Sequence, residues 1–131
     1  MATVEAATAV VAIDAVLAAL TDAGIPATKD AGSFYPAPVG VLVGLPALTK
    51  RGLTSATFSV PVTVVSGDPL TDETKVARLY ALADDTAVAL RCDQYRPTSW
   101  SGGVNSEPLP AVELAAKVTL AAGSAAVQRE D

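Results

Sequence analysis

The alternation of apolar and polar positions divides the chain into two helices and four strands. Residues 3–22 and 71–91 repeat apolar side chains at spacings of three and four, which is typical of helices. Residues 38–44, 56–66 and 111–121 alternate apolar with polar or small side chains, which predicts strands, and a further strand is expected within 93–103. The expected fold class is therefore α+β, in the order α-β-β-α-β-β, with a largely antiparallel sheet and two helices packed on it.

The first predicted helix is apolar or small on most of its surface. One stripe is expected to face the core, yet the other side also carries small apolar side chains, where a surface helix is usually polar. We expect Gly24 to end this helix and Pro26 to prevent its continuation. The stripe consists of Ala6, Val10, Ile13, Leu17 and Leu20, and the other side contains Val4, Val11, Ala12, Ala15 and Ala19.

Proline and glycine mark the expected connections. Residues 26–37 are expected to form a connector, 46–55 a loop or hairpin connection, and 105–110 a turn. The elements together predict one domain over residues 1–122, followed by a polar tail at 123–131.

Individual glycines and prolines also carry structural information. Pro61 lies inside the clearest strand, which indicates either an edge position or a bulge. Gly40 and Gly44 flank a strand instead of opening a helix, so they indicate close backbone packing and not a phosphate-binding loop.

Composition narrows the function without identifying it. The chain has 131 residues, is 50% hydrophobic with a mean hydropathy of +0.39, and carries a net charge of −5. The negative charge argues against a nucleic-acid binder, and the absence of histidine removes the usual general base and the commonest metal ligand. The apolar N-terminal run lacks a positive flank and is too short to span a bilayer. We therefore expect no enzyme, no catalytic residues, no metal, no cofactor and no membrane contact.

The surplus of alanine and valine has two possible explanations. Either the amino-acid usage of the source is biased towards these residues, or the protein has extra apolar surface that a partner covers. The outer side of the first helix offers three interface candidates. The one basic dipeptide either meets an acidic partner or lies at a solvated loop tip. An aromatic pair in a segment rich in proline, serine and glycine either contacts a partner or covers the core. These candidates are Val4, Val11, Ala15, Lys50, Arg51, Tyr95 and Trp100.

Several segments resemble a known family, the tail terminator proteins of long-tailed (siphovirus-type) bacteriophages, especially those of actinobacterial hosts. The resemblance covers about residues 10–121 and consists of structural residues and element order, without a catalytic signature. The segments that carry it are Leu17-Ala-Ala-Leu20-Thr-Asp-Ala-Gly24-Ile25-Pro-Ala, Pro36-Ala-Pro-Val39, Val60-Pro-Val-Thr-Val-Val65-Ser-Gly, Leu79-Tyr-Ala-Leu82-Ala and Leu109-Pro-Ala-Val112-Glu-Leu.

The resemblance implies a structural virion protein, made in the host cytoplasm and located at the head-proximal end of the tail. Such proteins form a ring, usually a hexamer, that caps the tail tube, stops its polymerisation and joins it to the head connector. Their partners are further copies of themselves, the tail tube protein and the connector proteins, and the genome DNA passes through the lumen. A chain with a net charge of −5 suits such a channel, because like charges repel.

Two other functions remain open from the sequence. The first is another head-tail connector or minor tail protein, which position along the virion axis would distinguish. The second is a small-ligand-binding or regulatory α+β domain that dimerises. It would need a concave pocket with converging polar groups, for which the sequence offers Tyr80, Tyr95, Arg96 and Trp100.

Overall fold

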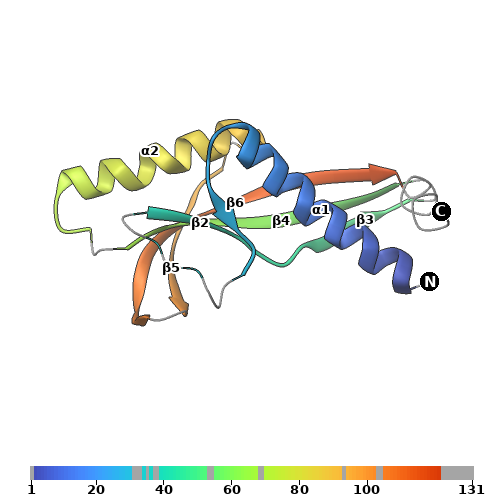
Figure 1. Cartoon of the computed structure of the whole chain (residues 1–131), viewed down its shortest axis with the longest axis horizontal. Helices are drawn as coiled ribbons and strands as arrows, with labels where there is room; N and C mark the ends of the chain where they lie inside the picture. Colours follow the sequence, from blue (N-terminus) through green and yellow to red (C-terminus); the bar gives the residue numbers. More distant parts are fainter. Residues whose placement is uncertain are drawn as a thin grey trace.

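The structure is a computed structural model of the chain. It describes residues 2–30, 34, 36, 39–52, 55–67, 70–92, 94–102 and 105–121, with side chains described for these residues except 2–8, 51, 102, 105–107 and 121. The expected polar tail at 123–131 lies outside the described residues. The described part contains helices α1 (Ala2–Asp22) and α2 (Glu73–Leu90) and the strands β1 (Ala27–Thr28), β2 (Val39–Val43), β3 (Ala47–Arg51), β4 (Ser55–Ser66), β5 (Arg96–Gly102) and β6 (Asn105–Ala121) (Figure 1).

The α+β class is confirmed, and both helices and all four expected strands are present, but the expected order was incomplete. The described strands form one mixed sheet in the order β1-β2-β4-β6-β5, with β3 beside β4. The pairings of β4 with β2, β3 and β6, and of β5 with β6, are antiparallel, whereas β1 pairs with β2 in parallel. Strands β1 and β3 lie in segments that the sequence predicted as a connector and as a loop or hairpin connection.

The expected turn at 105–110 was wrong, because β6 already begins at Asn105. Pro110 made this segment look like a turn. It pairs with Ser99 of β5, and the pairing of β6 with β4 begins only at Ala111. Backbone hydrogen-bonding groups point to alternate sides along a strand. A backbone N–H at position 110 would point towards β4, but β4 does not pair with β6 at this position, so proline is tolerated there. The strand therefore accommodates this proline without losing a ladder hydrogen bond.

Pro61 is also explained by its place in the ladder. Strand β4 is central, so the expected edge position was wrong. One side of β4 is shared by two strands, with β3 pairing up to Ser59 and β2 pairing from Val62. Pro61 lies at the seam between them, where its carbonyl oxygen accepts a hydrogen bond from the N–H of Gly44 at 2.8 Å. Its missing N–H faces the same seam opposite Gly44, which lies just beyond the end of β2, so the paired residues of β2 and β3 lose no hydrogen bond.

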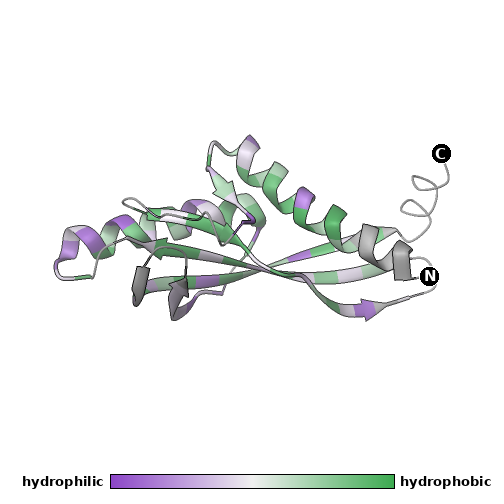
Figure 2. Ribbon diagram, turned by 60° about the horizontal axis from the view of Figure 1, so that its bottom comes forward, coloured by the Kyte–Doolittle hydropathy of each residue, from purple (hydrophilic) through white to green (hydrophobic). Residues whose placement is uncertain are grey.

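Both helices cover the same face of the sheet and close the main core (Figures 1 and 2). The inward side chains of β4 and β6 alternate as the sequence predicted, and they are buried together with those of β2. The largest of these fully buried side chains are Val41, Val43, Val60, Val62, Val64, Val112 and Leu114.

The buried face of α1 differs from the expected stripe. Ala12, placed on the outer side, is fully buried together with Val16 and Leu20, whereas Val10 of the expected stripe is 50% exposed. The expected stripe was therefore wrong in its rotation about the helix axis. The physical reason is that a helix apolar on most faces can bury any of them, and small side chains such as Ala12 let the helix approach the sheet closely.

The opposite face of the sheet carries a second, smaller core. Phe34, Leu42, Val65, Leu109 and Ala111 are buried there, and Trp100 packs against them. The rings of Phe34 and Trp100 meet edge to face with centroids 5.1 Å apart. Gly40 is required beside this cluster, because an added Cβ would lie 2.8 Å from Phe34 Cε1. The expectation that Gly40 marks close packing is thus confirmed.

Both helices end in the same hydrogen-bonded motif. After α1, Gly24 adopts a φ of 77°, its N–H bonds to Thr21 O at 3.0 Å, and Ile25 N–H bonds to Leu20 O at 2.8 Å. After α2, Arg91 adopts a φ of 58° and the N–H of the next residue bonds back in the same way. This is the Schellman arrangement, in which a left-handed residue satisfies the last carbonyls of the helix. The expected role of Gly24 is confirmed.

Candidate interaction surfaces

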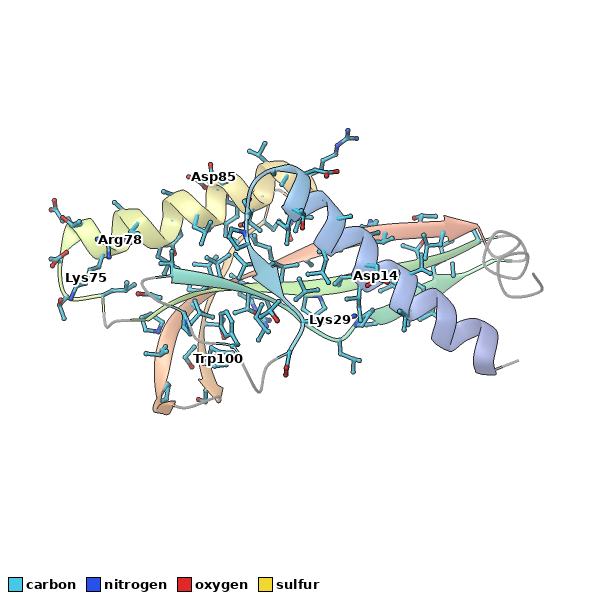
Figure 3. All side chains as sticks on the ribbon, in the orientation of Figure 1. Asp14, Lys29, Lys75, Arg78, Asp85 and Trp100 are labelled. Carbon is cyan, nitrogen blue, oxygen red and sulfur yellow. The ribbon has the colours of Figure 1, made fainter. Side chains whose placement is uncertain are left out.

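The outer face of α1 is built from small apolar side chains. Ala15 and Ala18 are exposed, Val11 is half-buried, and Val10 is exposed at the margin. Asp14 lies on the same exposed side, where its carboxylate is 3.6 Å from Lys29 Nζ (Figure 3). The side chain of Val4, the third candidate on this helix, lies outside the described side chains. Of the residues predicted on the outer side of α1, only Ala15 is exposed among the described side chains, whereas Val11 and Ala19 are half-buried and Ala12 is buried; Ala18, which was not predicted, is also exposed.

Strand β3 displays the basic dipeptide on a strand instead of a loop tip. Lys50 is exposed, and the side chain of Arg51 lies outside the described side chains. Leu48 on the same strand is 44% exposed, and Leu45 just before it is 84% exposed. Leu48 is opposite Phe58 and Lys50 is opposite Thr57, so the irregularity between them places the leucine and the lysine on opposite faces of the sheet.

The two aromatic candidates lie in different surroundings. Trp100 is half-buried against Phe34 in the second core, which agrees with the core alternative for this residue. Tyr95 is 37% exposed, and its hydroxyl donates a hydrogen bond to Asp84 Oδ1 at 2.5 Å. This hydrogen bond raises the pKa of Tyr95, and burial and the charge of Asp84 act in the same direction. The hydrogen bond of Tyr95 thus connects the residue just before β5 with α2.

A groove of about 950 Å³ lies beside β6 where β5 ends. Arg96 in its wall donates a hydrogen bond to Glu113 at 2.5 Å. Lys117 of β6 and Arg91 of the α2 end motif add two exposed cations, and Cys92 Sγ donates to Ala115 O at 3.2 Å. Among the described groove residues, three side chains are cationic and one is anionic.

The structure brings together only part of what the sequence offered for a ligand pocket. Tyr95 and Arg96 line the groove, whereas Tyr80 packs against the main core and Trp100 against the second. Sequence reasoning missed Arg91 and Lys117, which are far apart along the chain and meet only through the fold. The outward position of Lys117 in the alternation of the last strand was the one available signal.

The acidic and cysteine side chains are dispersed over the described part of the chain. No group of three or more aspartate, glutamate or cysteine side chains gathers within the described ranges. Asp84 of α2 accepts the hydrogen bond from Tyr95. Among the helices described, none combines the length and apolar character that crossing a bilayer requires.

Comparisons with known proteins add no relative. No family model, no curated protein and no solved structure matches the chain.

Proposed function

We propose that the chain is a structural virion protein that assembles into a ring, a hexamer by its resemblance to tail terminators, at the head-proximal end of a phage tail. The observation that carries the proposal is the exposed face of α1, where Ala15 and Ala18 lie exposed on the same side as Asp14, at positions that are usually polar on a surface helix. In this function the ring caps the tail tube, stops its polymerisation and joins it to the head connector.

Ring formation places a particular demand on the subunit surface. In a ring each subunit uses two different patches, so more of its surface must be apolar or small than in a monomer. The outer face of α1 and the exposed Leu45 and Leu48 lie on different parts of the chain and supply two such patches. Small side chains such as Ala15 allow the backbones of two subunits to approach closely, which supports the choice of α1 as one of the patches.

The proposal can be tested by placing a charge on the outer face of α1. Ala15→Asp is expected to convert a ring-sized species into monomers in sedimentation velocity, because the carboxylate would be desolvated in the contact. Since Ala15 is exposed, the free energy of unfolding should fall by less than about 1 kcal/mol through helix propensity alone. Val11→Asp is less informative, because Val11 is half-buried and its change affects folding as well.

Ala81→Asp is the matched control, since Ala81 is exposed in the middle of α2. It makes the same chemical change on the other helix and should leave the ring intact. A wild-type chain that stays monomeric at all concentrations and is absent from purified virions would contradict the proposal. Localising the chain in virions by electron microscopy separates a tube cap from another connector or minor tail protein.

A further inference from the structure

We propose that the outer edge of β6 beyond β5, together with the groove beside it, binds an extended acidic segment of a partner protein as an added strand. This inference does not depend on the ring, because it concerns the backbone edge of β6, although Ala15 of α1 lines a smaller pocket together with Arg91 and Lys117. It rests on the direction of the backbone groups along β6 and on the charges that surround them.

The backbone of β6 presents outward hydrogen-bonding groups along this edge. Pro61 of β4 is opposite Ala115, and its carbonyl oxygen bonds away from β6, to Gly44. Pro61 and Ala115 therefore form a non-hydrogen-bonded pair, so the N–H and C=O of Ala115 point away from β4. The hydrogen bond from Cys92 Sγ to Ala115 O confirms this direction. By alternation the backbone groups of Lys117 and Thr119 also point outward.

Strand β5 covers only the first part of this edge. It pairs with β6 from Asn105 to Glu113. The segment before β5 contacts the edge once more, through the hydrogen bond from Cys92 Sγ to Ala115 O. Beside Lys117 and Thr119, β6 has no paired strand among the described residues except β4. A sheet edge with outward N–H and C=O groups is a template for strand addition. An added strand would continue the line that β5 begins.

The side chains around this edge select for an acidic segment. Arg91, Arg96 and Lys117 line the groove, and Glu113 is the one carboxylate among the described groove residues. Glu113 already bonds to Arg96, which leaves the cationic charge in excess. This is a local reversal of sign in a chain whose net charge is −5. Carboxylates on alternate positions of an added strand would point to the same face as Lys117.

Charge argues against a second copy of this chain as the occupant. The edge of β3 that has no paired strand among the described residues would bring Lys50 towards Lys117 and the groove arginines. Pairing two β6 edges would bring the groove cations of both copies together. Both arrangements place like charges side by side across strands, which is unfavourable. A nucleic acid would satisfy the cations but not the alternating backbone donors and acceptors, so an acidic peptide segment fits best.

The test uses the full chain and a fluorescein-labelled peptide in which glutamate alternates with valine and threonine, followed by fluorescence anisotropy. Binding should weaken about tenfold in Lys117→Glu, since charge-assisted contacts are lost and repulsion is added. Thr119→Pro removes one outward N–H without changing a charge and should also weaken binding about tenfold if the backbone takes part, whereas Thr119→Val, which removes only the hydroxyl contact with Thr57, should not. Arg78→Glu is the matched control, because Arg78 is exposed on α2, and it should change the affinity by less than roughly twofold.

Three further probes test whether another kind of partner binds at this edge of β6 instead. The same peptide with lysine in place of glutamate, a single-stranded oligonucleotide and inorganic phosphate are offered to the wild-type chain. In amide spectra, the acidic peptide should shift the resonances of 115–119, and the other probes should not. The proposal is overturned if the lysine peptide, the oligonucleotide or phosphate binds as well as the acidic peptide, or if Thr119→Pro leaves peptide binding unchanged. It is also overturned if Thr119→Pro abolishes self-association, since the edge then serves a second copy. Measuring the peptide on the Ala18→Asp variant keeps the result independent of ring formation, because Ala15 lines a pocket together with Arg91 and Lys117 and exposed Ala18 does not.

Discussion

The matched end motifs of the two helices allow an internal comparison of backbone strain. Gly24 and Arg91 hold equivalent left-handed positions, yet only the first is glycine. A residue with a Cβ is strained in this conformation by about 1–2 kcal/mol, and glycine offsets part of that gain through the extra freedom of the unfolded chain. We expect Arg91→Gly to raise the free energy of unfolding by about 0.5–1 kcal/mol. Gly24→Ala should lower it by about 1 kcal/mol.

The surroundings of Gly24 make the loss of stability expected for Gly24→Ala a measure of backbone strain alone. A Cβ added at Gly24 would meet no other heavy atom within 4 Å, so no clash contributes. In a chain of 131 residues, 1 kcal/mol corresponds to a shift in Tm of about 3–4 °C, which thermal unfolding followed by circular dichroism resolves easily. Urea unfolding gives the free energies independently.

Arg91→Ala provides the control, because it removes the guanidinium but keeps the strained backbone. The free energy of unfolding of Arg91→Ala should stay near that of the wild-type chain, whereas that of Arg91→Gly should be higher. The reasoning is refuted if Arg91→Gly is less stable than the wild-type chain, or if the alanine variant gains as much as the glycine variant. In the latter case the arginine side chain, and not the left-handed backbone, would be the source of the strain.

Three further expectations concern the groove and the two cores. Tyr95→Phe should remove an ultraviolet-detected phenol titration whose midpoint lies above pH 10, because the hydrogen bond to the α2 carboxylate raises the pKa of Tyr95. That bond stabilises the fold below pH 10 and its contribution is lost as the pH rises through the raised pKa, so the variant and the wild-type chain should converge in stability at high pH. Gly40→Ala should destabilise the chain and change the environment of Phe34 in side-chain NMR spectra, because the new methyl group lies too close to the ring. Leu114→Ala should cost about 2–5 kcal/mol in urea unfolding, since Leu114 is 1% exposed. The same change at Leu45, which is 84% exposed, should cost less than about 0.5 kcal/mol; equal losses at the two sites would contradict the burial pattern.

The sequence predicts strands well where one face is buried and helices less well where every face is apolar. Strand β4 was predicted almost to the residue, because its alternation separates the core side from the polar side. Helix α1 was predicted in its bounds but not in its rotation. The choice between Val10 and Ala12 as the inward residue depends on how closely the helix approaches the sheet, and this is a property of tertiary packing.

Short strands and strand prolines account for the remaining errors. Strand β3 has little apolar alternation of its own, and it is held by its pairing with β4. Pro61 and Pro110 indicated interruptions, but each lies where the neighbouring strand is absent on the side of the missing N–H. Such positions become visible only when the order of strands is known. The groove could not be predicted for the same reason, since it depends on where β5 stops beside β6.

The long ladder between β4 and β6 also bears on how the chain is made. It joins Ser55 to Ala121 at one end and Val65 to Ala111 at the other, so the central strand of the sheet waits for residues synthesised much later. At about 5–20 residues per second, roughly three to ten seconds pass between the synthesis of the end of β4 and that of the end of β6. During that interval the valines of β4 have no neighbour on one side. The nascent chain is therefore a natural client for chaperones that recognise extended apolar segments, and its folding is committed only when the last strand leaves the ribosome.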